Sequence, residues 1–314
     1  MSLDRLIENI VEKQNPTVAG LDPKLAYIPH FIKETAFKKY GKTLEGAAEA
    51  LLVYNKALID ALYDIVPAVK PQLAYYEMYG WQGVKTFAET VSYAKSKGMF
   101  VITDGKRNDI GTTMEAYANA HLGITDIDGE SLSAFGADAL TVNGYLGTDG
   151  IKPVVSVSQK MDTGMFVLVK TSNPSSGELQ NLTLSENDEA IYLHMGKLCE
   201  EWGKELSGKY GYSGVGAVVG ATYPLQLTEL RKALPHTFFL VPGYGAQGGT
   251  ADDIAGAFDK NGLGAVVNSS RGIMCAWQKE KDCNPEDFSL AARHEALKMK
   301  KLLTDVTGKI ALPQ

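Results

Sequence analysis

Cysteine is scarce in this sequence, which has three in 314 residues: Cys199, Cys275 and Cys283. The number is odd and no two of them stand at a paired spacing, which argues against a disulfide framework and against a zinc site. We therefore expect buried or incidental thiols. The five histidines fall in expected helices or loops and none ends an expected strand, so histidine catalysis is not expected either.

Long apolar runs are also missing. No window of the sequence approaches the roughly 18 apolar residues of a membrane-spanning helix. The apolar residues from Leu3 to Val11 are interleaved with Asp4, Glu8 and Glu12 in an amphipathic pattern, whereas a signal peptide has a basic start and a continuous apolar stretch. We therefore expect a cytosolic (cytoplasmic) protein that does not bind membranes.

The sequence also lacks a stripe of basic residues. The formal net charge is -6 at pH 7, which does not support a nucleic-acid partner and favours small-molecule chemistry. The composition, with 45% hydrophobic and 22% charged residues, is that of an ordinary globular protein. No low-complexity linker or internal repeat divides the chain, so residues 1–314 are expected to form one catalytic domain.

Short apolar segments typical of β-strands recur eight times, and segments with helical periodicity accompany them. The expected strands are Thr17–Asp22, Ala68–Leu73, Phe100–Lys106, Ala139–Asn143, Phe166–Ser172, Gly216–Thr222, Phe238–Gly243 and Ala265–Ser270. The expected helices include Gly46–Tyr63, Gly83–Ser96, Glu189–Leu206 and Phe288–Leu303. This alternation predicts an α/β fold, a (β/α)8 TIM barrel; its length beyond about 250 residues is assigned to insertions after strands one and five, at Lys24–Leu62 and Pro174–Tyr212.

The third expected strand ends in a charged segment, Asp104-Gly105-Lys106-Arg107-Asn108-Asp109. Side chains alternate along a strand, so Asp104 and Lys106 share one face, and Asp109 follows after the chain has turned. Lys106 is therefore expected between two carboxylates, which favour its ammonium form and make it a proton donor rather than a neutral nucleophile. For an isolated D-x-K pattern, a solvated surface ion-pair cluster is the alternative.

Other strands also end in polar residues, at the edge of the barrel where such enzymes place catalytic groups. Strand one ends at Asp22, strand two carries Lys70, and strand five ends in Ser172. A lysine inside an apolar strand is costly unless it is paired, so Lys70 is expected to contact Asp22 or Asp104.

Strands seven and eight run into the loops that commonly hold phosphate in these barrels. Gly243, Gly245 and Gly248 match G-x-G-x-x-G, but a dinucleotide fingerprint belongs in the first βαβ unit of an open sheet. The pattern instead favours one phosphate, held by backbone amides and by the forked cation of Arg271. The alternative is that the glycines serve only a tight turn and that Arg271 forms a surface salt bridge.

The segment after strand three resembles the signature of the orotidine 5'-phosphate decarboxylase family, D-x-K-x-x-D-I followed by a small residue, any residue and a threonine. The matching positions are Asp104, Lys106, Asp109, Ile110, Gly111 and Thr113. The loop Pro242–Gly249 and the turn Ser270–Gly272 are similar to the phosphate loops of this family, although Ser270 stands where many members have glycine. The resemblance runs from about Val18 to Ile273 and, with the two insertions, indicates the longer bacterial and protozoan subgroup.

The resemblance implies decarboxylation of orotidine 5'-phosphate to UMP and carbon dioxide, the last step of de novo pyrimidine nucleotide synthesis, without a metal or an organic cofactor. It implies that Lys106 stabilises a carbanion at carbon 6 and donates a proton, assisted by Asp104 and by Asp109 of the partner subunit. The resemblance also implies a homodimer with shared active sites. The implied substrate-binding residues are Asp22, Lys70, Thr113, Asn143, Ser172, Gln247, Gly248 and Arg271.

Among these residues, Ser172 is expected to bind the imide edge of the pyrimidine, while Asp22 and Lys70 face the ribose. Two other functions stay open. A magnesium-dependent decarboxylase or aldolase acting on a phosphorylated keto-sugar shares the D-x-K-x-x-D strand, but it needs a carboxylate near the end of strand two, where this sequence has Lys70. A non-catalytic nucleotide-binding barrel is disfavoured by the intact lysine and aspartate array.

Overall fold

The computed structural model describes residues 2–245, 248–280 and 283–313. Within these ranges, eight parallel strands close into a barrel in the order β1-β10-β9-β8-β7-β6-β3-β2. The strands are β1 Thr17–Leu21, β2 Ala68–Pro71, β3 Phe100–Arg107, β6 Ala139–Val142, β7 Gly164–Lys170, β8 Val215–Val219, β9 Phe239–Val241 and β10 Ala265–Ser269. Each coincides with one of the eight expected segments, so the predicted TIM barrel is confirmed.

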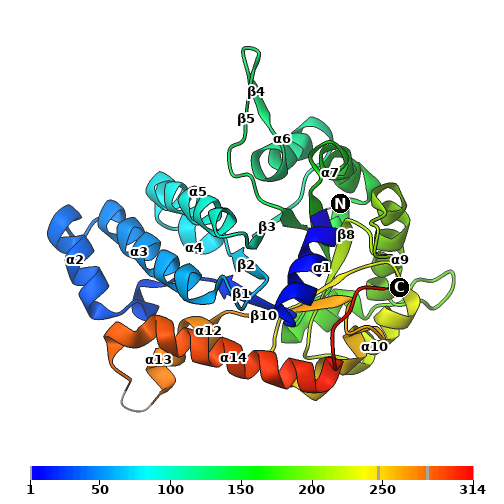
Figure 1. The fold of residues 1–314 in the computed structure, drawn as a ribbon. Helices are drawn as coiled ribbons and strands as arrows, with labels where there is room; N and C mark the ends of the chain where they lie inside the picture. Colours follow the sequence, from blue (N-terminus) through cyan, green and yellow to red (C-terminus); the bar gives the residue numbers. More distant parts are fainter. Residues whose placement is uncertain (1, 246–247, 281–282, 314) are drawn as a thin grey trace.

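Helices surround the barrel on its outer side (Figure 1). The longer helices are α1 Ser2–Lys13, α2 His30–Tyr40, α3 Leu44–Leu62, α5 Gly80–Ser96, α6 Gly111–Leu122, α7 Thr148–Met161, α9 Ile191–Gly203, α10 Pro224–Ala233 and α14 Phe288–Thr307. The short helices are α4 Ala74–Glu77, α8 Gly177–Gln180, α11 Ala251–Ile254, α12 Arg271–Met274 and α13 Ala276–Lys279. Single 3-10 turns are η1 Leu25–Tyr27, η2 Gly144–Leu146, η3 Pro174–Ser176, η4 Lys204–Leu206, η5 Ala255–Ala257 and η6 Pro285–Asp287.

Helix α1 closes one end of the barrel. Its apolar residues Leu3, Leu6, Ile7 and Ile10 are buried in one cluster with Val18, Ala68, Phe100, Ala139, Phe166 and Phe238. Most of these partners stand at or near the first residue of a strand. The amphipathic pattern at the N-terminus thus supplies a hydrophobic plug for the amino-terminal end, and the carboxyl end is left for a site.

The first expected insertion, after β1, contains η1, α2 and α3. Helix α3 begins after Thr43, whose hydroxyl accepts a hydrogen bond from the Gly46 amide at 3.1 Å. Helices α2 and α3 extend together to one side of the barrel (left in Figure 1), and α3 also packs against α5 and α14. The second insertion, after β7, contains η3, α8 and α9.

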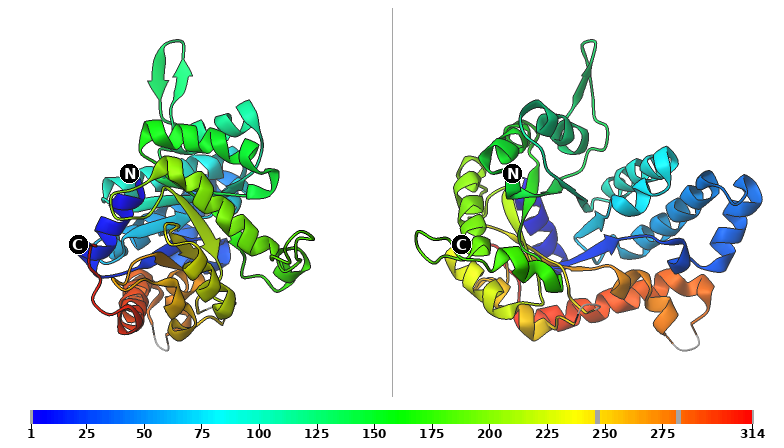
Figure 2. Two further views of the ribbon diagram at one scale, coloured as in Figure 1. Left: turned by 90° about the vertical axis from the view of Figure 1, so that its right-hand side faces the viewer. Right: turned by 180° about the vertical axis from the view of Figure 1, so that it is seen from behind.

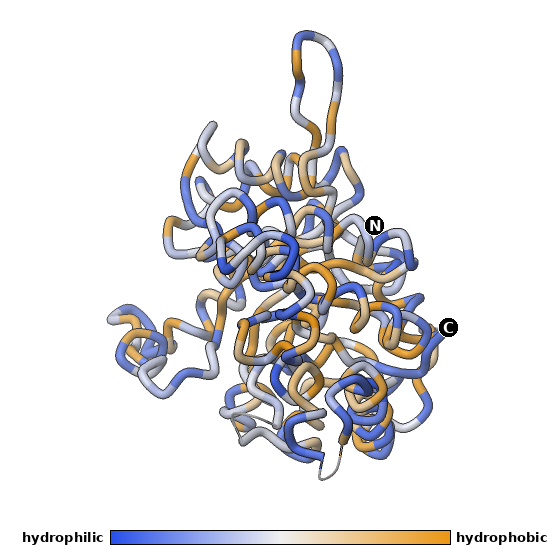
Figure 3. The backbone as a smooth tube through the Cα atoms, turned by 90° about the vertical axis from the view of Figure 1, so that its left-hand side faces the viewer, coloured by the Kyte–Doolittle hydropathy of each residue, from blue (hydrophilic) through white to orange (hydrophobic). Residues whose placement is uncertain are grey.

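One feature was not predicted: an antiparallel hairpin of β4 Thr125–Ile127 and β5 Glu130–Leu132. It stands clear of the barrel in the views of Figures 2 and 3 and carries both hydrophilic and hydrophobic residues. Its two turn residues, Asp128 and Gly129, have φ angles of 54° and 93°, which the D-G dipeptide tolerates. The D-G signal was present in the sequence, but the flanking strands are too short and too polar to stand out.

No helix in the described ranges is long and apolar enough to cross a membrane. The cytosolic location stays a prediction. Cys199 and Cys275 are buried, Cys283 is partly buried, and all three are free thiols, as the sequence indicated.

Candidate active site

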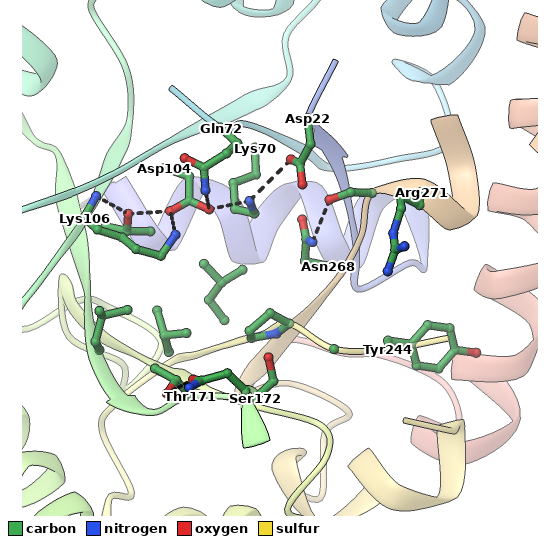
Figure 4. A pocket seen from close by; sticks show the side chains of 18 of the residues that line it. Asp22, Lys70, Gln72, Asp104, Lys106, Thr171, Ser172, Tyr244, Asn268 and Arg271 are labelled. Carbon is green, nitrogen blue, oxygen red and sulfur yellow. Dashed lines mark hydrogen bonds and ion pairs between the residues drawn. The ribbon is translucent and has the colours of Figure 1, made fainter. Parts of the chain in front are cut away.

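A cavity of about 760 Å³ opens at the carboxyl ends of the barrel strands (Figure 4). Several of the predicted site residues line it: Asp22, Lys70, Asp104, Lys106, Ser172 and Arg271. They come from the ends of the four strands β1, β2, β3 and β7 and from the start of α12, so the fold brings together residues that are far apart in sequence. This arrangement is the one that the barrel prediction required.

The Asp104 carboxylate is the centre of the charged cluster in this cavity. Its Oδ1 accepts hydrogen bonds from Lys106 Nζ at 2.6 Å and Thr141 Oγ1 at 2.8 Å. Its Oδ2 accepts hydrogen bonds from Lys70 Nζ at 2.6 Å and Gln72 Nε2 at 3.0 Å. Burial acts to raise the pKa of Asp104, but the charges and hydrogen bonds of the two lysines outweigh it and hold that pKa well below its usual range. Asp104 is therefore an anion that fixes both ammonium groups.

Lys70 lies between two carboxylates, as its place in an apolar strand required. Its Nζ is 2.6 Å from Asp104 Oδ2 and 4.0 Å from Asp22 Oδ1. Burial acts to lower the pKa of Lys70, but the charges of Asp104 and Asp22 outweigh it and raise that pKa. Asp22 Oδ1 is itself buried and accepts no hydrogen bond within the described ranges, so a hydroxyl of a bound molecule can donate to it.

Lys106 owes its position to an irregularity in β3. The register between β3 and β6 shifts from Thr103↔Leu140 to Arg107↔Val142, which leaves two more residues on β3 than on β6. Within this bulge Lys106 has a φ of 46°, and its amide donates a hydrogen bond to Thr141 Oγ1 at 3.0 Å. A non-glycine residue in this conformation is strained, and bulges of this kind re-aim side chains beside active sites.

The second carboxylate expected beside Lys106 is not in contact with it within one chain. Asp109 Oδ1 accepts a hydrogen bond from the amide of Ile110 at 2.8 Å. Within one chain Lys106 therefore contacts Asp104 and not Asp109, and the contact with Asp109 of the partner subunit, which the resemblance implies, stays a prediction. Among the described residues that line the cavity, none is Asp109, Thr113, Asn143 or Gly248.

Asn143 has a local role in the structure. Its side-chain oxygen accepts a hydrogen bond from the Tyr145 amide at 3.0 Å and so caps η2. Thr113 lies in the exposed first turn of α6. Asn143, Thr113 and Asp109 all follow strands that contribute to the cavity. None of the three lines the cavity formed by its own chain.

The opposite side of the cavity has the features of an anion site. Gly243, Tyr244, Ser270 and Arg271 line it. Gly243, Gly245 and Gly248 have φ angles of 93°, 68° and 99°, a conformation that glycine adopts without strain. The Arg271 side chain is exposed and forms no hydrogen bond or ion pair with the described residues, which leaves its five donors available. Gln247 lies outside the described residues.

Sequence reasoning missed several polar residues of the cavity: Gln72, Thr141 and Gln180. Thr141 is a polar residue inside an apolar strand, so the argument used for Lys70 could have found it. Asn268 Nδ2 donates to Ser270 Oγ at 3.2 Å, while its Oδ1 is buried without a partner in the described ranges. A side chain at Gly20 would come within 2.0 Å of Ser270 Oγ, so glycine is required beside this pair.

Comparison with known proteins agrees with this geometry. The model of the orotidine 5'-phosphate decarboxylase / HUMPS family matches residues 47–283. The chain is 47% identical over 283 residues to the orotidine 5'-phosphate decarboxylase of Rhodopirellula baltica, covering 90% of this chain and 89% of that protein. It is 42% identical over 275 residues to the protein of the same name from Caldicellulosiruptor saccharolyticus, covering 88% and 90%.

Solved structures show the same similarity to orotidine 5'-phosphate decarboxylases. The structure of the Leishmania donovani OMP decarboxylase superimposes with a TM-score of 0.74 at 27% sequence identity, and the match covers 98% of both chains. The similarity therefore extends over the barrel and over both insertions.

Proposed function

The chain belongs to the orotidine 5'-phosphate decarboxylase / HUMPS family, and we propose from that membership that its barrel decarboxylates orotidine 5'-phosphate to UMP and carbon dioxide. The enzyme is thus a carboxy-lyase of UMP biosynthesis, and residues 1–314 act as one catalytic unit. The proposed mechanism depends on one observation. The two oxygens of the Asp104 carboxylate accept hydrogen bonds from Lys106 Nζ and Lys70 Nζ, at 2.6 Å each.

Lys106 is the proton donor. Loss of carbon dioxide breaks a carbon–carbon bond and leaves an electron pair on carbon 6 of the pyrimidine, and the Lys106 ammonium stabilises that charge and then transfers a proton to the same carbon. The side chain of Lys106 is 46% exposed, so it can recover a proton from water after each turnover. Asp104 stays ionised, orients the ammonium and repels the carboxylate of the substrate.

The remaining cavity residues bind the substrate away from the reacting bond. Asp22 and Lys70 bind the ribose hydroxyls, Ser172 binds the imide edge of the pyrimidine, and Arg271 binds the phosphate together with Gln247 and the amides near Gly248. Binding energy from the phosphate then helps to align the pyrimidine with Lys106.

A homodimer supplies the residues that one chain's cavity lacks. Asp109 and Thr113 flank Ile110, which is 51% exposed, at the start of α6. In the proposed two-fold dimer, this segment of one subunit enters the cavity of the other, where Asp109 faces Lys106 and Thr113 contacts the substrate.

A magnesium-dependent keto-sugar enzyme is the competing function within the family. Magnesium needs several hard oxygen ligands. Here the Lys70 ammonium fills the space between Asp22 and Asp104, and the described ranges hold no group of three or more His, Cys, Asp or Glu that could bind a cation. The donor set therefore favours chemistry carried by Lys106.

A spectrophotometric assay tests the proposal. Purified protein should consume orotidine 5'-phosphate, with loss of its ultraviolet absorbance, at equal rates before and after dialysis against EDTA. Lys106→Ala should lower turnover by roughly 10²- to 10⁴-fold or more, since it removes the general acid, while calorimetric binding of UMP persists.

Lys298→Ala, at an exposed position of α14, is the matched control and should keep full activity. Activity that returns only with added magnesium would favour the keto-sugar enzyme. Substantial turnover by Lys106→Ala would remove this lysine from the role of proton donor.

A further inference from the structure

Lys170, the last residue of β7, is a buried lysine outside the charged cluster of the active site. Its side chain is 0% exposed, it does not line the cavity, and within the described ranges it forms no ion pair with a carboxylate. Burial lowers the pKa of Lys170. A buried amine without a counter-ion is costly, so the contacts that this group makes must offset that cost.

Those contacts come from the segment after β7, from the start of α9 and from the residue before α10. Lys170 Nζ donates hydrogen bonds to Ser176 Oγ and to Asn181 Oδ1, both at 3.0 Å. It also lies 4.2 Å from the ring centroid of Tyr223 and 5.8 Å from that of Tyr192. An ammonium at these distances from aromatic rings makes a favourable cation–π interaction.

A bulge in β7 directs Lys170 to these partners. The register with β8 shifts from Leu168↔Val218 to Lys170↔Val219, so β7 has one extra residue at this point. Leu168 lines the cavity, and strict alternation would direct Lys170 to the same side. The bulge turns the lysine away from the cavity, as such irregularities do beside active sites.

Residues 171–181, which we call the Ser172 loop, are fastened at several further points. Gln180 Oε1 accepts a hydrogen bond from the Thr171 amide at 3.0 Å, and Thr222 Oγ1 donates to the Ser172 carbonyl at 3.1 Å. Tyr223 OH donates to the Asn173 carbonyl at 3.1 Å. Figure 4 shows Thr171 and Ser172 facing the cavity from this loop. The Ser172 hydroxyl forms no hydrogen bond with the described residues, so the loop is held by its other groups.

Close packing against β8 leaves this loop little freedom. A side chain at Gly220 would come within 2.8 Å of Ser172 Cα, and the Gly220 amide donates to the Lys170 carbonyl at 2.7 Å. Lys170 therefore joins the end of β7 to the far part of the Ser172 loop, at Ser176 and Asn181.

We propose that Lys170 is a positioning residue that holds the Ser172 loop in the conformation that recognises the pyrimidine base. The inference rests on the proposed function, in which Ser172 binds that base. Lys170 contacts this loop and the two tyrosines, whereas the proposed phosphate ligand Arg271 stands after β10. Lys170 therefore affects binding of the base and does not affect binding of the phosphate.

The test compares binding of UMP with binding of ribose 5-phosphate, which lacks the base. Calorimetry gives both dissociation constants for the wild type, for Lys170→Met and for the control Lys298→Met. We expect Lys170→Met to weaken UMP binding by about tenfold or more, equivalent to about 1.4 kcal/mol, while ribose 5-phosphate binding changes by less than about twofold. The control should change neither constant.

A second variant, Ser176→Ala/Asn181→Ala, removes the loop partners of Lys170 and decides the question if Lys170→Met does not fold. It should cause the same selective loss of UMP binding. An unchanged ratio of the two constants in the folded variants would overturn the inference, since a merely structural lysine lowers the melting temperature without altering base recognition. Equal loss of both ligands would also overturn it. Wild-type protein that binds no UMP would overturn the proposed function along with this inference.

Discussion

Among the side chains of the cavity, Asp104 binds two lysines that lie in different surroundings. Lys70 is buried between Asp104 and Asp22, whereas Lys106 is partly exposed on the other carboxylate oxygen. A buried ammonium with two carboxylates cannot readily give up a proton, because the proton holds the pair together. Lys106 contacts one carboxylate and is accessible to water, so it can give up a proton. In the proposed mechanism, the surroundings of a lysine rather than its residue type thus decide which of the two donates the proton.

Thr141 is the residue whose replacement tests how Lys106 is held. Its hydroxyl accepts from the Lys106 amide and donates to Asp104 Oδ1. Thr141→Val keeps the shape but leaves a backbone donor unpaired, so we expect kcat to fall by about 10- to 100-fold with little change in KM. Steady-state kinetics measure both constants. Thr141→Ser should restore most of the activity, and a normal kcat for the valine variant would contradict this role.

The pair of Asp104 and Lys70 also predicts how stability depends on pH. The pKa of Asp104 is held below its unfolded value of about 3.9, so its contribution is present above about pH 4 and is lost as the pH falls through the folded pKa. The pKa of Lys70 is raised, so its contribution is present below about pH 10 and is lost as the pH rises through the folded pKa. The pair is complete between these limits.

Asp104→Asn leaves Lys70 buried without its nearest anion and should cost about 3–5 kcal/mol at pH 7. Urea unfolding at a series of pH values measures the free energy of unfolding of both proteins. The difference between wild type and variant should shrink progressively below about pH 4. A difference that stays constant down to pH 2 would show that Asp104 titrates normally.

At the level of strands and helices, prediction was accurate wherever burial sets the pattern. The eight strands were located because each is an apolar segment such as Ala265–Ser269, buried on both faces. The bulges in β3 and β7 could not be found, since no residue type in them requires an extra position. Those two irregularities set the positions of Lys106 and Lys170, so strand periodicity could not predict where these two lysine side chains are directed.

The packing of two strands inside the barrel depends on Gly216 of β8. A Cβ at this position would lie 2.6 Å from Cδ1 of Phe166 and 2.7 Å from the carbonyl oxygen of Phe238. Gly216→Ala should therefore lower the free energy of unfolding by about 1–3 kcal/mol, measured by urea denaturation. Gly214→Ala is the control, because its nearest neighbour would be the Leu206 side chain at 3.2 Å. Equal losses in the two variants would mean that the Phe166 ring and the backbone at Phe238 both shift at little cost, and would contradict this role of Gly216.

In the molecule as a whole, the two ends of the barrel have different tasks. Helix α1 seals the amino-terminal end with apolar side chains, and the carboxyl end gathers charged residues from strands that span most of the sequence. Stability is thus supplied at one end, and the other can hold the strained backbone of Lys106 and the buried charges of Asp104 and Lys70. Of the predicted residues that do not line this cavity, two belong to the start of α6: Asp109 shortly precedes this helix, and Thr113 lies in its exposed first turn.

Mixing two inactive variants tests whether those outside residues serve a second subunit. Lys106→Ala and Asp109→Ala are each expected to be inactive as homodimers. After reversible dissociation and reassociation, about half of the dimers should be mixed, and each mixed dimer has one doubly damaged site and one intact site. Activity should then return to about a quarter of the wild-type value. A mixture that stays inactive, although mass spectrometry confirms subunit exchange, would mean that Asp109 acts within its own chain and that the sites are not shared.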